Sequence, residues 1–80
     1  MKKYFYPVIF QPEDVGFSAV VPDIPGCMTQ GDTMEETLDM LQEAIGLMLD
    51  GVQENDYPKP SLPQDISTDG TQFVMMVPFD

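Results

Sequence analysis

The stretch Pro25-Gly26-Cys27-Met28-Thr29-Gln30-Gly31-Asp32-Thr33-Met34-Glu35-Glu36 decides the fold, because its second half has the pattern of a helix start. Thr33 and Glu36 have the spacing of a capping box, in which the hydroxyl accepts a backbone N–H of the first turn and the glutamate reaches back to the cap. Asp32 and Glu35 add negative charge where the helix dipole favours it. A helix is therefore predicted to begin at Thr33.

One amphipathic helix is predicted from residue 33 to about residue 54. Its apolar residues recur with gaps of four and three, which is the spacing of a single helical stripe: Met34, Leu38, Leu41, Ile45, Met48 and Val52. Gly46 and Gly51 each weaken a helix by roughly 1 kcal/mol relative to alanine. Gly51 is also a candidate C-terminal cap. We expect the helix to continue past it, because Val52 stays on the stripe.

Short strands are predicted around this helix. The segments rich in aromatic and β-branched residues, or bounded by turn residues, are 3–12, 17–22, 27–30 and 72–79. Three prolines in residues 55–71 predict an extended crossover between the helix and the last strand. The order is β-β-β-α-β, and a crossover between parallel strands is right-handed. We therefore expect an α+β fold with a mixed four-stranded sheet and one long helix on one face.

The strands are apolar on both faces. In the first strand Tyr4 and Tyr6 alternate with Phe5, and Val8 alternates with Ile9. A strand that is buried on one side only should alternate apolar and polar residues. One helix covers one face, so the other face is expected to expose an apolar patch, which is typical of an interface. The alternative is that the proline-rich loop folds over this patch. The interpretation that we prefer is an interface with a partner or with a second copy of the chain.

The totals describe one small acidic domain. The chain has 80 residues, 14 acids, 3 bases and a net charge of −11. It has no basic surface to displace counterions from phosphates, so direct nucleic-acid binding is not expected. A basic protein partner is the natural complement, although acidity can also serve solubility alone. No apolar run reaches the ~18 residues of a membrane span and no signal peptide is recognisable, so we expect a cytoplasmic protein that does not contact membranes.

The sequence argues against catalysis. It has no histidine, and its single cysteine, Cys27, has no basic neighbour in sequence and is interpreted as a small core residue. Six of its 14 acids fit the solvated face of the helix, and none form an EF-hand loop. Met34, Met40 and Met48 are interpreted as helix packing. We therefore predict no catalytic residues, no metal site and no cofactor, and a chain that is not an enzyme.

The order of elements and one motif resemble the N-terminal domain of HicB-type antitoxins. The motif is the run Pro-Gly-Cys-x-Thr-x-Gly-x-Thr-x-Glu-Glu at residues 25–36, placed between a hairpin and a helix and followed by Pro58-Lys59-Pro60-Ser61. Thr37 departs mildly from the alanine that is usual in the family. The resemblance implies a partial ribonuclease H-like fold. It makes residues 1–80 a single HicB-like domain, without the C-terminal DNA-binding domain that many such antitoxins carry.

The resemblance also implies a function, the binding and occlusion of a small, basic, mRNA-cleaving toxin of the HicA type. It implies as well that the chain forms a homodimer or a higher homo-oligomer. From charge and expected exposure, the candidate toxin contacts are Glu13, Asp14, Asp23, Asp32 and Glu35. One alternative is an orphan acidic oligomeric domain that binds another protein or a small ligand. Another is a metal-dependent nuclease that uses Glu43 or Asp39 with Asp80, which is disfavoured because the first strand lacks an internal acid.

Overall fold

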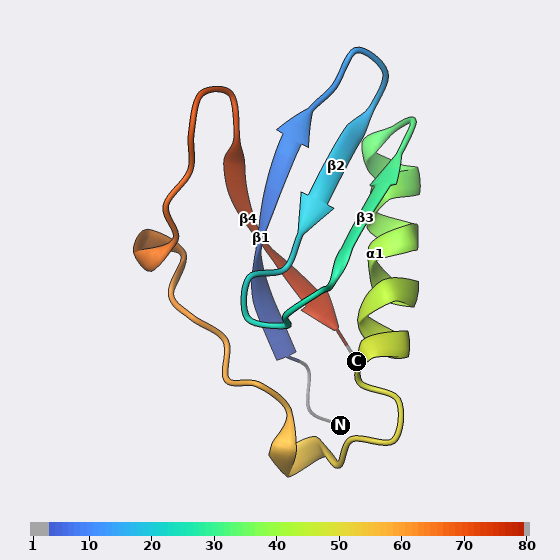
Figure 1. The fold of residues 1–80 in the computed structure, drawn as a ribbon, viewed down its shortest axis with the longest axis vertical. Helices are drawn as coiled ribbons and strands as arrows, with labels where there is room; N and C mark the ends of the chain where they lie inside the picture. The colour runs from blue at the N-terminus through green and yellow to red at the C-terminus, as the bar shows by residue number, and fades with distance from the viewer. Residues whose placement is uncertain (1–3, 80) are drawn as a thin grey trace.

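The chain has the predicted β-β-β-α-β order. The computed structural model describes residues 4–79. Its elements are β1 (Tyr4–Pro12), β2 (Phe17–Val20), β3 (Met28–Gly31), α1 (Met34–Met48), the short 3-10 helices η1 (Glu54–Asp56) and η2 (Pro63–Asp65), and β4 (Phe73–Phe79) (Figure 1). The α+β class, the four strands and the single long helix are confirmed.

The four strands form one antiparallel sheet in the order β3-β2-β1-β4. The predicted mixed sheet is therefore wrong. The reason is the segment of residues 49–72, here called the return loop. It runs back along the length of the molecule after α1, so that β4 enters the sheet from the hairpin end (Figure 1). β4 consequently pairs antiparallel with β1 from Tyr4↔Phe79 to Phe10↔Phe73, at the sheet edge opposite β3.

The start of α1 is fixed by a capping box that reaches one residue further than usual. The Thr33 hydroxyl accepts the backbone N–H of Glu36 at 3.0 Å. The Glu36 carboxylate accepts the backbone N–H of Asp32 at 2.8 Å, instead of that of the cap residue. Both donors would otherwise lack a partner within the helix. The predicted helix start is confirmed.

The end of α1 comes earlier than predicted. The helix stops at Met48 with Leu49 as its C-cap, and Gly51 has a φ of 80°. The N–H of Val52 then bonds the carbonyl of Leu49 in a turn at 3.0 Å. A glycine in the left-handed region is a common helix terminator, because it carries no Cβ penalty. Gly51 therefore outweighs the apolar character of Val52, and the predicted extension to residue 54 is wrong.

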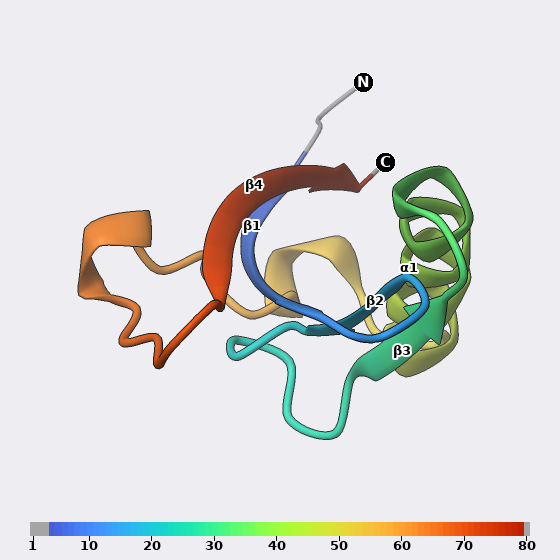
Figure 2. The same ribbon diagram turned by 90° about the horizontal axis from the view of Figure 1, so that it is seen from above.

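The core lies between the helix and the inner face of the sheet. Figure 2 shows the sheet curved around this space, with α1 beside β3 at its open side. The helix contributes a buried stripe of Thr37, Leu41, Ile45 and Leu49. The sheet and its connections contribute Tyr6, Val8, Phe10, Ala19, Val21, Ile24, Cys27 and Val77. Burial of such side chains is the main favourable term in folding.

Two contacts hold the return loop on the domain. The Tyr6 hydroxyl donates to the Pro58 carbonyl at 2.8 Å. The Asp23 carboxylate accepts the backbone N–H of Ser61 at 2.7 Å and its hydroxyl at 2.6 Å. Hydrogen bonds to a charged acceptor are among the stronger ones. The return loop is therefore anchored in its middle as well as at its ends.

The outer face of the sheet, which is turned away from α1, is apolar as predicted. Residues that pair across antiparallel strands share a face. The pairs Met28↔Val20, Val20↔Ile9 and Ile9↔Val74 therefore place one apolar row across all four strands, here called the outer row. Pro7, also on this face, is buried. The outer row is still accessible, because Met28 is 65% exposed and Val20 is 38% exposed.

Candidate binding surface

The tip of the β1–β2 hairpin packs directly on the junction between β3 and α1. A Cβ at Gly16 would lie 1.9 Å from the Gly31 carbonyl oxygen and 2.6 Å from the Asp32 Cα. Gly16 also has a φ of 75°, which L residues with side chains rarely adopt. The tight turn therefore brings the hairpin acids and the helix-start acids to the same end of the molecule.

Four of the five predicted contacts gather at this end. Glu13 and Asp14 lie on the hairpin tip, and Asp32 and Glu35 lie at the start of α1; all four are exposed. We call these four residues the acidic tip. Between the hairpin and β3 lies a hollow of about 360 Å³, lined by Glu13, Val15, Phe17, Gln30, Gly31 and Asp32.

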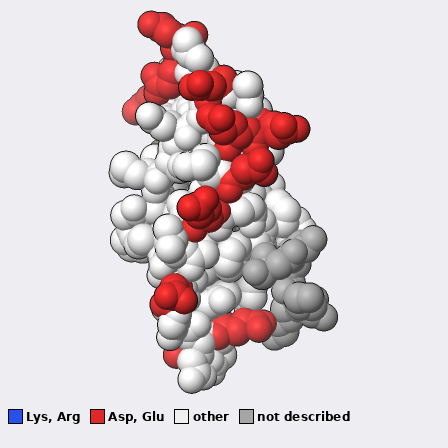
Figure 3. Space-filling model, turned by 90° about the vertical axis from the view of Figure 1, so that its right-hand side faces the viewer, with Lys and Arg blue, Asp and Glu red and all other residues white. Residues whose placement is uncertain are grey.

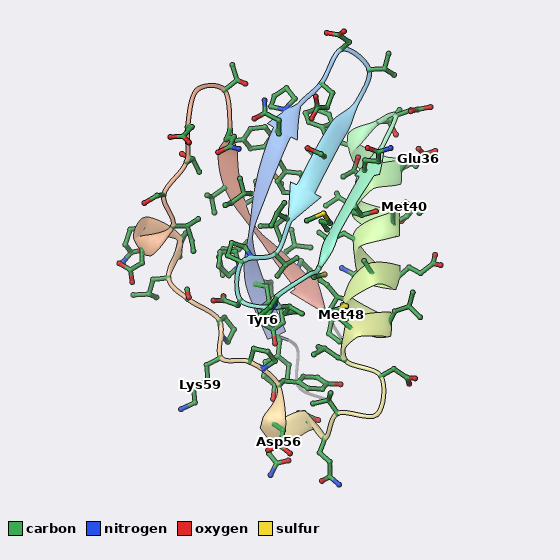
Figure 4. All side chains as sticks on the ribbon, in the orientation of Figure 1. Tyr6, Glu36, Met40, Met48, Asp56 and Lys59 are labelled. Carbon is green, nitrogen blue, oxygen red and sulfur yellow. The ribbon has the colours of Figure 1, made fainter. Side chains whose placement is uncertain are left out.

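The acidic tip continues along the exposed side of α1. Glu36, Asp39 and Glu43 follow Glu35 at helical spacing and are exposed. Figure 3 shows acidic side chains gathered in a band on the side of the molecule that carries α1, with no basic side chain visible on it. Within residues 4–79 the only base is Lys59, which lies at the other end of the molecule from Glu36 (Figure 4). The acidic potential of this surface is therefore not neutralised from within residues 4–79.

Asp23, the fifth predicted contact, lies elsewhere. It follows β2, whereas Glu13 and Asp14 precede β2, so the length of that strand separates it from the acidic tip. Its carboxylate is only partly exposed and holds Ser61 of the return loop. The structure thus gives Asp23 a role in anchoring the loop. Sequence spacing alone could not reveal this, because the two partners are far apart in the chain.

Two exposed apolar side chains lie among the acids of α1. Met40 is 42% exposed and Leu47 is 71% exposed, and both lie on the helix side that carries Glu36 and Glu43. The interpretation of Met40 as helix packing is therefore wrong. Met48 is also 43% exposed, whereas Met34 packs against the core as expected. The exposure of Met40 and Leu47 could have been predicted from the sequence, because both residues fall outside the helical stripe that is buried.

Within residues 4–79 no three carboxylates or thiols come together as a possible metal site. Asp39 and Glu43 lie one turn apart on the exposed helix side, and Asp80 lies outside the described residues.

Burial raises the pKa of the Cys27 thiol, so less of the nucleophilic thiolate is present at neutral pH. Cys27 is thus the core residue that the sequence predicted. Within the described part of the chain, no helix is long and apolar enough to span a bilayer.

The fold and this surface define a small, acidic α+β domain whose exposed features are suited to binding. The family model described as "HicB_like antitoxin of bacterial toxin-antitoxin system" matches residues 6–73. The chain belongs to this HicB-like antitoxin family. Membership of an antitoxin family confirms the prediction that the chain is not an enzyme.

Curated relatives agree with this assignment. The protein named Antitoxin HicB 2 of Photorhabdus laumondii is 40% identical over 62 residues, which are 75% of this chain and 45% of that protein. A UPF0150 protein of Synechocystis is 38% identical over 63 residues, which are 78% of this chain and 86% of that protein. An uncharacterised protein of Haemophilus phage HP1 is 36% identical over 55 residues, 69% of this chain and 41% of that protein. The chain thus spans less than half the length of two of these relatives.

Two solved structures share the fold. A chain of a toxin–antitoxin complex from Streptococcus pneumoniae superposes with a TM-score of 0.78 at 24% identity, over 99% of this chain and 70% of that chain. A chain of the HicA3 and HicB3 toxin–antitoxin complex superposes with a TM-score of 0.73 at 23% identity, over 95% of this chain and 98% of that chain. The antiparallel arrangement described above is therefore an established fold.

Proposed function

We propose that this chain acts as the antitoxin of a toxin–antitoxin pair in the cytoplasm, and that it binds and covers a small basic toxin of the HicA type. The observation that carries the proposal is the acidic tip, which combines exposed carboxylates from the hairpin and the helix start on a chain of a toxin–antitoxin family. Occlusion of the toxin requires no chemistry, cofactor or metal from this chain.

The charge of the surface supports fast encounter with a basic partner. Complementary potentials raise association rates above those of neutral surfaces, and this gain falls as salt screens the charges. Exposed ion pairs each contribute only about 0.2–1 kcal/mol, so charge alone does not give tight binding. The exposed Met40 and Leu47 beside the acids add apolar area that a partner can bury. We expect the complex to use both kinds of contact.

The test is a titration against a catalytically inactive HicA-type toxin from the same genome, in low and moderate salt. The test variant neutralises the acidic tip with Glu13→Gln, Asp14→Asn, Asp32→Asn and Glu35→Gln. The matched control makes the same change in net charge away from the tip, with Asp50→Asn, Glu54→Gln, Asp56→Asn and Asp65→Asn. We expect the tip variant to bind at least about tenfold more weakly, with a smaller salt dependence, and the control to bind nearly as well as the wild type.

Two outcomes would contradict the proposal. Equal weakening by both variants would show that only net charge matters. A folded wild-type chain that does not bind the toxin would leave the orphan acidic domain as the better function.

The nuclease alternative predicts Mg²⁺-dependent RNA cleavage by the chain alone, so the absence of cleavage would exclude this alternative. The homo-oligomer that the family resemblance implies is also part of this proposal.

A further inference from the structure

The described sheet ends at β3 before it has covered both flanks of α1. β3 is an edge strand, because it pairs with β2 on one side only. Figure 2 shows α1 beside β3 at the open side of the curved sheet. The flank of α1 that is turned toward β4 is occupied, because Gln42 donates to the Pro78 carbonyl. On the opposite flank, past β3, no further strand of the described chain lies beside the helix.

The flank of α1 past β3 carries exposed apolar side chains. Thr37 marks this flank, because a Cβ at Gly31 of β3 would lie 2.6 Å from its backbone nitrogen. At about 100° per residue, Met40, Leu47 and Met48 lie on the same flank as Thr37, away from the side that is turned toward β4. They are 42%, 71% and 43% exposed. We call these three residues the apolar flank, and they lie where one more strand would cover them.

The open edge of β3 presents unpaired backbone groups. The Val21 N–H donates to the Cys27 carbonyl at 3.0 Å, which sets the alternation of bonded and non-bonded pairs along β2 and β3. Met28 and Gln30 therefore stand in non-bonded pairs, so their N–H and C=O groups point away from β2. β3 contains no proline and no charged residue, which are common means of blocking a strand edge. Another strand can therefore pair with this edge.

The opposite edge of the sheet, at β4, is less suited to strand pairing. Pro7 has no N–H and stands opposite Met76, so this is a non-bonded pair and Met76 points its backbone groups outward. By the same alternation Val74 and Pro78 also point outward. Pro78 has no N–H to offer, and its carbonyl is already bonded by Gln42. β4 thus provides an edge of similar geometry that is partly blocked.

The charge beside the β3 edge favours a basic partner over a second copy of the chain. Glu36 and Glu43 are exposed on α1, next to Met40 on the helix surface. A second copy with a net charge of −11 would bring further carboxylates toward them, whereas a basic partner is attracted. Alternate side chains of an added strand face the helix. A segment that alternates apolar residues with lysine or arginine therefore matches this surface.

We infer that the β3 edge accepts an extended segment of the basic partner as an added strand, and that this strand covers the apolar flank of α1. Strand addition takes affinity from backbone hydrogen bonds and specificity from alternate side chains. This arrangement rests on the proposed function, because it describes how the toxin is held. The acidic tip adjoins the end of the same edge, since Asp32 follows Gly31, so it guides the partner toward the strand.

The first test removes the outward N–H of Gln30. Gln30→Pro deletes this donor and places a ring at the edge, but it leaves the bonds between β3 and β2 in place. Val74→Pro makes the same change at the β4 edge, where Pro78 shows that a proline is tolerated, and Gln30→Ala controls for the lost side chain. In titrations of the full chain with the inactive HicA-type toxin, Gln30→Pro should raise the dissociation constant at least about tenfold. Both controls should stay within about twofold of the wild type.

Amide hydrogen exchange tests the same edge without a substitution. The N–H groups of Met28 and Gln30 should exchange at least about tenfold more slowly in the toxin complex than in the free chain. Those of Val74 and Met76, at the β4 edge, should keep their rates. This measurement also decides the matter if circular dichroism shows that Gln30→Pro does not fold.

The apolar flank is tested by Met40→Gln, with Leu62→Gln on the return loop as the control. Leu62 is 57% exposed, against 42% for Met40. Met40→Gln should raise the dissociation constant about fivefold and leave its salt dependence unchanged, because an uncharged contact is lost. Leu62→Gln should have no effect. Equal effects of the two variants would show that the apolar flank is not covered.

Three results would overturn strand addition at β3. The first is a folded Gln30→Pro variant that binds like the wild type, or is weakened only as much as Val74→Pro. The second is unchanged exchange of Met28 and Gln30 in the complex. The third is protection of these amides in the free chain that grows with its concentration, which would assign the edge to a second copy. If the wild type binds the toxin and the edge tests fail, only this inference fails, whereas a wild type that does not bind removes the proposed function as well.

Discussion

Gly31 is where the sheet and the helix come closest, and alanine there should be far more harmful than its small size suggests. A Cβ at Gly31 would lie 2.6 Å from the Thr37 backbone nitrogen, 2.7 Å from its Oγ1 and 2.9 Å from its Cα. Ordinary contacts begin near 3.4 Å. The helix start would therefore have to move by about 0.8 Å, which disturbs a fully buried region, and overpacking of this kind costs roughly 1–3 kcal/mol.

Gly46 provides the matched control, because it receives the same methyl group in open space. Its nearest neighbour would be the Phe79 ring, 4.0 Å away. Gly46 lies inside α1, where alanine is favoured over glycine by about 1 kcal/mol. Gly31→Ala should lower the free energy of unfolding by about 2–3 kcal/mol, and Gly46→Ala should raise it by about 1 kcal/mol. A domain of this size has a total stability of roughly 4–12 kcal/mol, so the two variants differ by a large share of it.

Urea unfolding followed by far-ultraviolet circular dichroism measures both effects. The reasoning would be refuted if Gly31→Ala were within about 0.5 kcal/mol of the wild type, since overpacking predicts more. The double variant with Thr37→Ala tests which atoms matter. It removes the Oγ1 contact but leaves the backbone nitrogen and Cα, so it should not restore stability. Full rescue would show that the side chain, and not the close approach of the backbone, sets the constraint.

Three further predictions concern single contacts. Thr33→Ala should lower the free energy of unfolding by about 1 kcal/mol because the cap is lost, whereas Thr33→Ser should keep most of that stability. Urea unfolding measures both variants. Asp23→Ala should lower the free energy of unfolding by about 1–3 kcal/mol and speed proteolysis within the return loop, because Ser61 loses its hydrogen-bond acceptor. An unchanged rate of cleavage would argue against Asp23 as an anchor of the loop. Burial raises the pKa of Tyr6 above its ordinary value of 10.0, so the unfolded chain loses this proton first and stability should fall as the pH rises above about 10. Urea unfolding of Tyr6→Phe should show a smaller fall over that pH range, and an equal fall would contradict the assignment.

The sequence predicts best what is decided locally. The capping box around Thr33 and the strand segments rich in aromatic and β-branched residues depend on neighbouring residues, and both were found close to where they were predicted. The end of α1 was missed because two local signals conflict, the apolar stripe at Val52 and the glycine at Gly51. At that position the backbone preference of glycine decided the outcome.

The direction of β4 could not be predicted, because it depends on the path of the return loop. That path is held by Asp23 with Ser61 and by Tyr6 with Pro58, and no local pattern reveals such distant partners. The same limit applies to the candidate surface. The sequence correctly predicted that the four acids of the acidic tip are exposed, but it could not predict the long-range contact between Asp23 and Ser61. Net charge alone also gave no sign that the acids and the neutral outer row occupy different faces.

The pairing of Tyr4 with Phe79 gives the domain a modular character. The chain enters and leaves the described sheet at one point, on adjacent antiparallel strands. Termini that lie close together permit a domain to be inserted into a larger chain, or to be circularly permuted, without strain. A short linker from Phe79 to Tyr4, with new ends opened at the exposed Gly70 turn, should therefore give a permuted chain with the same sheet. The same geometry allows a fusion partner at either end to stay clear of the acidic tip.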